Sequence, residues 1–170
     1  ETLRRGEISG SFGRSIGEFE ELVAEYCGVR HAVSVSSGTT ALHVAVAATD
    51  SRRGGEVLVS ASTNIATALA AYHNDLVPVA VDSERRTWNL DLDLLEDLIT
   101  PGTVGIIPVH LFGHPVDMDA LMAIADRHGL WVIDDCAESL GATCRGRMTG
   151  SFGLAGCHSF YANKIITTGE

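Results

Sequence analysis

Ionisable side chains of two kinds lie where apolar segments of the chain end. Lys164 follows the apolar segment 155–160 and has small, hydroxylated or apolar neighbours, whereas Asp134 and Asp135 close the apolar segment 130–134. A lysine amine in such surroundings can form a Schiff base with a carbonyl carbon. A carboxylate at the end of a buried strand requires a cation or strong hydrogen-bond donors. A solvated lysine, and aspartates that cap or face solvent, are the alternative interpretations.

Residues 36–40, SSGTT, place hydroxyl groups and a glycine between an apolar segment and a predicted helix. Glycine lets the backbone approach an anion closely, and the free amides and dipole of a helix N-terminus favour a phosphate. Ordinary capping by serine or threonine is the alternative, and neither a GxxxxGK[ST] nor a GxGxxG pattern is present. A phosphate site, a carboxylate and a lysine are together what pyridoxal phosphate (PLP) requires, because the carboxylate pairs with the pyridine nitrogen and keeps the ring an electron sink.

An alternation of apolar strands and helices must position these groups. The pattern predicts a first helix that Ser15 caps with Glu18 in a capping box and that Gly28 ends. It then predicts strands at 31–35, 55–60, 77–82, 103–109, 130–134 and 155–160, and helices at 39–48, 64–73, 92–99 and 118–129. Apolar, β-branched strands of this kind are buried on both faces of a mostly parallel sheet. The chain is therefore predicted to be an α/β protein whose ligands gather at the carboxyl ends of the strands.

The composition argues against several classes of protein. The 170 residues carry 22 acidic side chains against 12 Lys plus Arg, a formal net charge of −10, so binding to nucleic acid or to an anionic membrane is not expected. No apolar stretch reaches the length of a membrane span and no signal-peptide core is visible, so we expect a cytoplasmic protein. The four cysteines form no CxxC pair, and Gly113 and Pro115 argue against a metal-binding helix that carries His110 and His114. We expect free thiols and no metal.

The chain resembles the DegT/DnrJ/EryC1/StrS family of PLP-dependent aminotransferases, which act largely on keto-sugar nucleotides. The resemblance covers the whole chain through three stretches in the same order, EFEELVAEYCGVRHAVSVSSGTTALHVA, PVHLFGHPVDMDALMAIADRHGLWVIDDCAESLGA and GSFGLAGCHSFYANKIITTGE. It implies the large domain of an aspartate-aminotransferase-like enzyme of fold type I, with helices on both faces of a mostly parallel sheet. Residues 1–170 are then expected to be an incomplete large, PLP-binding domain with an N-terminal arm at 1–14 and without the C-terminal small domain.

The family pattern also implies roles for residues at the predicted strand ends. Lys164 corresponds to the catalytic lysine that forms the Schiff base with the cofactor. Asp135, 29 residues earlier (164 − 135 = 29), corresponds to the aspartate at the pyridine nitrogen. Three further residues correspond to the phosphate site: Gly38, Thr39 and Ser159.

Two positions depart from the common pattern of the family. Glu138 corresponds to the residue that faces the phenolic oxygen of the cofactor, which is usually glutamine. With SFYANKIITTGE, this glutamate is similar to the perosamine-synthase side of the family. Asn64 falls where the family often has an aromatic residue stacked on the cofactor ring, so stacking is expected to be weaker or to come from elsewhere.

The resemblance implies transamination of a keto group on a nucleotide-linked deoxysugar, with glutamate or glutamine as amino donor. Such enzymes serve sugar, antibiotic or cell-surface polysaccharide biosynthesis as homodimers with composite active sites. A cyclitol (inosose) aminotransferase of the same family is one alternative. A dehydratase of the family would carry histidine at the lysine position, so Lys164 argues against it. A non-catalytic fragment, or a module that depends on a partner, is the alternative from another class.

Overall fold

The computed structural model describes residues 4, 6 and 13–169. The chain forms two compact units, Glu1–Val35 and Ser36–Glu170. Most of the predicted N-terminal arm, 1–14, lies outside the described residues. None of the helices in the described part combines the length and the apolar character that a membrane crossing requires.

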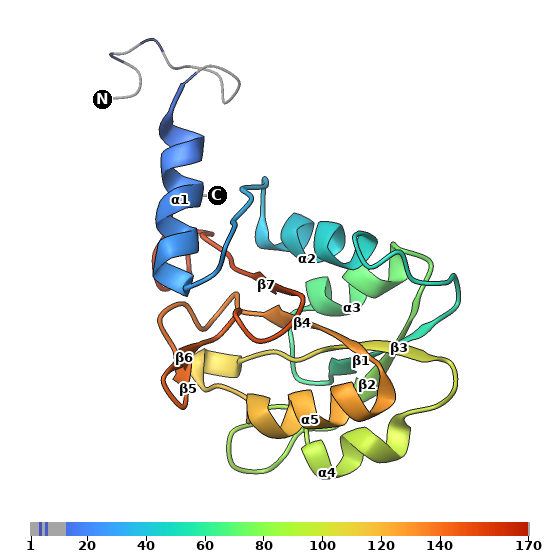
Figure 1. The fold of residues 1–170 in the computed structure, drawn as a ribbon. Helices are drawn as coiled ribbons and strands as arrows, with labels where there is room; N and C mark the ends of the chain where they lie inside the picture. The colour runs from blue at the N-terminus through green and yellow to red at the C-terminus, as the bar shows by residue number, and fades with distance from the viewer. Residues whose placement is uncertain (1–3, 5, 7–12, 170) are drawn as a thin grey trace. The chain divides into compact units, whose positions relative to one another are not determined.

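The first unit contains helix α1, Ser15–Cys27 (Figure 1). The helix ends at Gly28 in the left-handed conformation (φ 68°), as the sequence predicts. Its start differs from the prediction, because Arg14 and not Ser15 occupies the N-cap position. Arg14 already has near-helical backbone angles (φ −98°, ψ −12°), so Ser15 lies inside the helix and the predicted capping box with Glu18 is wrong.

Residues 31–35 were predicted to be a strand but belong to no β-ladder within the described part of the chain. Val33 is 78% exposed, and Val35 is also exposed. The backbone N–H and the hydroxyl of Ser34 donate to Oε1 of Glu20 at 2.7 and 2.9 Å. An apolar alternation predicts a strand correctly only where a second strand is available to pair with it, and here a side chain of α1 satisfies Ser34 instead.

The second unit is built on a five-stranded sheet in the order β2-β1-β3-β4-β7. Every neighbouring pair is parallel, which confirms the predicted sheet. The strands are β1 Glu56–Ser60, β2 Val77–Val81, β3 Thr103–Ile107, β4 Trp131–Asp135 and β7 Ala155–Cys157. Strands β3 and β7 end two to three residues earlier than predicted, so His110 and Ser159 lie on loops beyond the strands.

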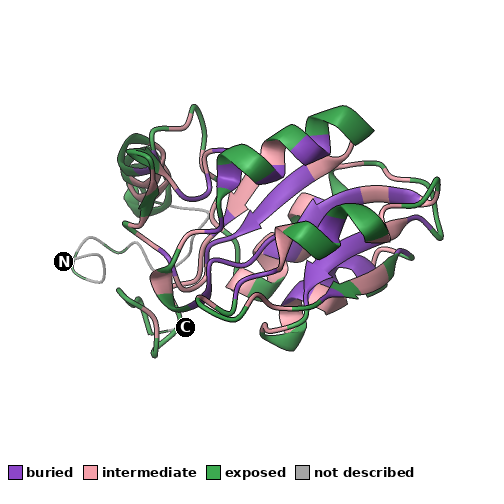
Figure 2. Cartoon of the chain, turned by 90° about the horizontal axis from the view of Figure 1, so that it is seen from below, coloured by how far each residue is buried: buried purple, intermediate pink, exposed green. Residues whose placement is uncertain are grey.

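Helices cover both faces of this sheet (Figures 1 and 2). Helices α2, Gly38–Ala47, and α3, Ile65–Tyr72, pack with one cluster of buried apolar side chains that includes Ile133 of β4. The other cluster includes Val132 of β4 and side chains of α5, Met118–His128. Because successive strand residues point to opposite faces, β4 serves both cores.

Three other segments complete the second unit. The predicted helix 92–99 is a single α-turn, α4 Leu92–Leu95, followed by the 3₁₀ turn η2, Glu96–Leu98. A short 3₁₀ turn, η3 Leu111–Gly113, follows β3. An antiparallel pair, β5 Thr143–Cys144 and β6 Arg147–Met148, was not predicted, because two residues per strand are too few for a periodic signal.

Gly105 and Trp131 fix the position of β4 next to β3. The two residues are partners in the parallel ladder. A Cβ atom at position 105 would lie 2.2 Å from the indole carbons of Trp131, so only glycine leaves room for the ring. The indole Nε1 of Trp131 donates to Ser51 Oγ at 2.9 Å. This close packing holds the strand that carries the two predicted aspartates.

Candidate active site

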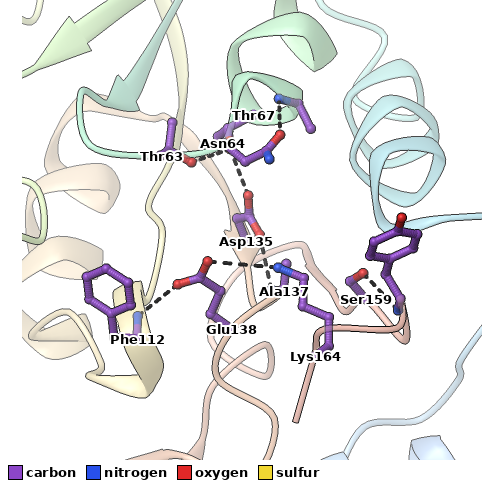
Figure 3. A network of polar contacts seen from close by, with 11 residues as sticks. Thr63, Asn64, Thr67, Phe112, Asp135, Ala137, Glu138, Ser159 and Lys164 are labelled. Carbon is purple, nitrogen blue, oxygen red and sulfur yellow. Dashed lines mark hydrogen bonds and ion pairs between the residues drawn. The ribbon is translucent and has the colours of Figure 1, made fainter. Parts of the chain in front are cut away.

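Asp135 is the last residue of β4, and it is only 4% exposed. Its Oδ2 accepts a hydrogen bond from the hydroxyl of Thr67 in α3 at 2.7 Å, and its Oδ1 accepts from the backbone N–H of Ala137 at 3.1 Å (Figure 3). The hydroxyl of Thr63 lies 2.7 Å from that of Thr67. Because Thr67 gives its only hydroxyl proton to the carboxylate, Thr63 must be the donor to Thr67.

The surroundings of Asp135 favour a cationic ligand. Burial raises the pKa of this carboxyl group, and the Thr67 and Ala137 hydrogen bonds and the positive charge of Lys164 act in the opposite direction. Two fixed donors favour the ionised carboxylate, but a buried charge is fully stabilised only by an opposite charge. The group is therefore suited to hold a protonated ring nitrogen.

Lys164 and Glu138 form an ion pair next to Asp135 (Figure 3). Lys164 Nζ lies 3.8 Å from Glu138 Oε1, and the two side chains are 20% and 35% exposed. The second oxygen of Glu138 accepts from the backbone N–H of Phe112 at 2.9 Å. Phe112 has φ 50°, a left-handed conformation that is uncommon for a non-glycine residue, and its ring is 83% exposed. In this conformation the backbone N–H of Phe112 points at the carboxylate of Glu138.

The predicted phosphate residues meet at the N-terminus of α2. Ser37 caps this helix, and its Oγ accepts from the backbone N–H of Thr40 at 3.1 Å. A Cβ atom at Gly38 would lie 2.9 Å from Cβ and 3.2 Å from Oγ of Ser159, so the backbone of α2 touches Ser159 because residue 38 is glycine. Thr39, the next residue, is exposed in the first turn. A ten-residue helix with a neighbouring hydroxyl at its N-terminus is suited to an anion.

Asn64 is the N-cap of α3, and its Oδ1 accepts from the backbone N–H of Ala66 at 3.0 Å. The side chain is exposed and has a capping role in this structure. Capping explains why an asparagine is favourable at this position.

The two histidines of PVHLFGHP lie in different surroundings. His110 is fully buried, and its backbone N–H donates to the carbonyl of Asp135 at 3.3 Å. His114 is exposed. The segment between them is the turn η3 and not an α-helix, as predicted. His110 instead lies near Asp134 and Cys136, with one ligand-type atom of each residue within 4.8 Å of the others. None of the four cysteines, all of which lie in the described part of the chain, forms a disulfide bond.

Sequence reasoning did not identify three residues of this site. Thr63 and Thr67 resemble ordinary helix-start residues, and only the fold brings them to Asp135, which is 68 residues from Thr67. Phe112 contributes a backbone N–H, and a backbone group leaves no signal in the residue type. The segment HLFGH, with Gly113 next to Phe112, was the one available sign of an unusual turn.

Comparisons by family profile, by sequence and by structure all point to the same family. The sequence profile of the DegT/DnrJ/EryC1/StrS aminotransferase family matches residues 1–170. The GDP-perosamine synthase of Caulobacter vibrioides is 51% identical over 94% of this chain and 43% of its own length. The aminotransferase from Psychrobacter cryohalolentis superimposes with a TM-score of 0.96 at 39% identity, over 99% of this chain and 42% of its own.

A third relative is the putative sugar aminotransferase Spr1654 from Streptococcus pneumoniae in its PMP form. It has a TM-score of 0.91 at 32% identity, over 99% of this chain and 46% of its own. The chain thus spans less than half the length of these relatives. The profile match, the sequence identities and the shared fold agree, and this chain belongs to the DegT/DnrJ/EryC1/StrS aminotransferase family.

Proposed function

We propose that this chain forms the cofactor-binding part of a PLP-dependent aminotransferase that aminates a keto group on a nucleotide-linked deoxysugar. The observation that carries the proposal is the arrangement of Lys164, Asp135 and the α2 N-terminus in one compact unit. The name of the Caulobacter relative supports a GDP-linked sugar, and the PMP form of the pneumococcal relative supports the cofactor.

The residues present fit PLP. Asp135 offers a buried carboxylate to the pyridine nitrogen, and the hydrogen bonds from Thr67 and Ala137 keep it in place. The phosphate would be held at the α2 N-terminus by Gly38, Thr39 and Ser159. Lys164 supplies the amine that the cofactor aldehyde requires. When bound, PLP supplies that aldehyde and a ring that accepts an electron pair from the substrate carbon.

In this proposal, different side chains of the site would bind the cofactor and transfer the proton. Asp135 keeps the proton on the pyridine nitrogen, because its ionised form is held by two fixed donors. Lys164 Nζ would move the proton, accepting it from the substrate carbon as a general base and donating it again as a general acid. Glu138, fixed by the Phe112 N–H, holds the lysine cation near this position.

The finer assignments follow from the same proposal. The amino donor is glutamate or glutamine, and the enzyme works in the cytoplasm as a homodimer whose partner subunit completes each site. Residues 1–170 represent part of a large PLP-binding domain, a proposal supported by the 43% of the Caulobacter relative that they span. The exposed ring of Phe112 and the exposed face of Thr39 are compatible with contacts from further protein.

Covalent trapping tests the proposal. The full-length protein that carries this segment is incubated with PLP, reduced with borohydride, digested and analysed by mass spectrometry. We expect the cofactor on Lys164, which is the only lysine among these 170 residues. Lys164→Arg keeps the positive charge and should carry no trapped cofactor. Label on a different residue in the wild-type protein would show that the lysine is assigned wrongly.

A second measurement tests the substrate. The holoenzyme is supplied with glutamate and either a GDP-linked keto-deoxysugar or an inosose, and the aminated product is identified by mass. Amination of the nucleotide sugar supports the proposal. Amination of the inosose alone would indicate the cyclitol alternative.

A further inference from the structure

A second polar cluster lies beneath the active site, on the face of β4 opposite to Thr67. It consists of His110, Asp134 and Cys136, which are 0%, 0% and 1% exposed. Asp134 and Asp135 are consecutive strand residues, so their side chains point to opposite faces of the sheet. Among the described residues, neither His110 Nε2 nor Asp134 Oδ1 has a hydrogen-bond partner. Buried polar atoms of this kind are rare and call for an explanation.

The tautomer of His110 follows from its other ring nitrogen. The backbone N–H of Val116 donates to His110 Nδ1 at 3.2 Å, so Nδ1 acts as acceptor and carries no proton. Burial, with a smaller contribution from His158, lowers the pKa of His110 to about 4, so the ring is neutral near pH 7. A neutral imidazole has one N–H group. That group must therefore be Nε2–H, a donor that faces the cluster.

Asp134 offers the matching acceptor. Its Oδ2 accepts from the backbone N–H of Gly150 at 3.0 Å, whereas its Oδ1 remains available. Burial raises the pKa of this carboxyl group to about 6, against the lowering effects of the Gly150 and Phe152 backbone and of the Arg147 charge, so it is largely ionised near neutral pH. A buried carboxylate oxygen requires a donor. One ring nitrogen of His110 and one carboxylate oxygen of Asp134 lie within 4.8 Å of one another, and the two atoms without partners are Nε2 and Oδ1, so each residue has what the other lacks.

Histidine, carboxylate and cysteine are also the side chains that hold transition metals. The geometry of His110 argues against this use. A histidine that binds metal through Nε2 almost always donates Nδ1–H to an acceptor, but here Nδ1 accepts from Val116. Burial also raises the pKa of Cys136 well above its ordinary value, so the thiol keeps its proton. Both observations favour a hydrogen bond over a metal ion in this cluster.

We propose that His110 donates Nε2–H to Asp134 and that this buried pair positions the strand end that carries Asp135. Three contacts connect the pair to the site. The backbone N–H of His110 donates to the carbonyl of Asp135 at 3.3 Å. The Nδ1 atom anchors the loop at Val116. Asp134 holds Gly150, whose loop leads into β7 and on to Ser159 and Lys164. The positioning role rests on the proposed function, whereas the tautomer of His110 does not.

Nuclear magnetic resonance tests the tautomer without cofactor. Histidine labelled with ¹⁵N is incorporated into the cofactor-free full-length protein, and long-range ¹H–¹⁵N spectra are recorded near neutral pH. The His110 signals are assigned by their loss in His110→Gln. We expect a protonated Nε2, an unprotonated Nδ1 and a slowly exchanging Nε2–H proton that moves in Asp134→Asn. A protonated Nδ1, or a cobalt–thiolate absorbance band on addition of Co²⁺, would overturn the proposal.

Two substitutions test the positioning role. His110→Gln can place an amide N–H where Nε2–H lies, whereas His110→Asn can place only an acceptor near Nδ1. With cofactor bound, we expect the Asn variant to lose about tenfold or more in kcat and the Gln variant to recover most of it, because small displacements of reacting groups are costly. Equal kcat values in the two variants would overturn the positioning role. A wild-type protein that binds no PLP would refute the proposed function but leave the tautomer measurement intact.

Discussion

Strand β4 ends in two adjacent carboxylates with different surroundings. Asp135 faces α3, where it accepts hydrogen bonds from the hydroxyl of Thr67 and the backbone N–H of Ala137 and lies in the field of the Lys164 charge. Asp134 faces the other side, where the backbone N–H of Gly150 donates to Oδ2, the Arg147 charge lowers its pKa, and we propose that His110 supplies the second donor. Both are almost fully buried, and burial raises the pKa of both.

Burial alone therefore does not distinguish the carboxylate that we propose binds the cofactor from its neighbour. Asp135 has a side-chain donor and a lysine charge nearby, an arrangement that suits the proposed cationic ring nitrogen. The available oxygen of Asp134 faces only other protein groups. The partners of a buried charge, and not its depth, therefore separate a ligand site from a structural site. Four measurements test this contrast between Asp135 and Asp134.

The largest effect on kcat is expected from replacing each of the two aspartates in turn by asparagine. Asp135→Asn should keep the phosphate site and bind cofactor but lose about a thousandfold in kcat, because the charge that holds the ring proton is removed. Asp134→Asn should lose about tenfold, as the loss of a positioning group. Steady-state kinetics on the two holoenzymes decide. A larger loss in Asp134→Asn would reverse the assignment.

The pH dependence of stability distinguishes the buried pair from the active site. The folded pKa of Asp134, about 6, exceeds its usual value of 3.8, so the native state binds more protons in that window and this group reduces stability as pH rises. The folded pKa of His110, about 4, is below its usual 6.5, so this group increases stability as pH rises through the same window. In the wild-type protein the two contributions oppose each other.

When the Asp134 carboxyl group is removed, the contribution of His110 to the pH dependence of stability should no longer be opposed. Between pH 4 and 7, the stability of Asp134→Asn relative to wild type should increase by up to about 3 kcal/mol, the value for a shift of roughly two pKa units, and by less to the extent that the proposed His110 bond lowers the pKa of Asp134. Urea denaturation at several pH values measures it. His110→Gln is the matched control and should change in the opposite direction. Parallel curves for all three proteins would contradict the assigned protonation states.

Thr67 tests the hydrogen bond that Asp135 accepts from a neighbouring side chain. Thr67→Val keeps the volume but removes the hydroxyl donor to Asp135, a hydrogen bond to a charged group worth about 2 kcal/mol. The pKa of Asp135 should rise further, because the Thr67 bond lowers it. The acid limb of the kcat–pH profile should therefore move to higher pH. Thr67→Ser restores the donor and should restore the profile; a valine variant with the wild-type profile would exclude the contact from catalysis.

Glu138 is expected to give the smallest effect. Glu138→Gln keeps an acceptor for the Phe112 N–H and loses only the charge of a partly exposed ion pair with Lys164. We expect kcat to change by no more than about fivefold. Glu138→Ala removes the acceptor as well and should change kcat more. If the Gln variant loses activity as completely as the Ala variant, the charge itself is required.

Much of this site could be predicted from the sequence, because strand ends are predictable where apolar runs are. Asp135, Ser159 and Lys164 follow such runs, and Gly38 precedes a helix, so each could be placed. The contact between Gly38 and Ser159 joins residues distant in sequence, and only the fold reveals it.

The features that the sequence predicted wrongly or did not predict have the same physical origin, which is that they depend on tertiary contacts. Whether 31–35 forms a strand depends on a pairing partner, which a local pattern does not contain. The left-handed conformation of Phe112 and the tautomer of His110 depend on what surrounds them in three dimensions. Local periodicity predicts elements, whereas the protonation and hydrogen bonding of a site are properties of tertiary contacts.

The indole ring of Trp131, packed on Gly105, gives this fold an intrinsic optical reporter. Trp131 is partly buried on the strand that ends in both aspartates, whereas Trp88, the other tryptophan, is 63% exposed. In a Trp88→Phe background, the tryptophan emission from this segment should arise from the β3–β4 ladder alone. Its wavelength should shift to the red when that ladder opens, so the integrity of the strand beneath the active site can be followed in real time by fluorescence.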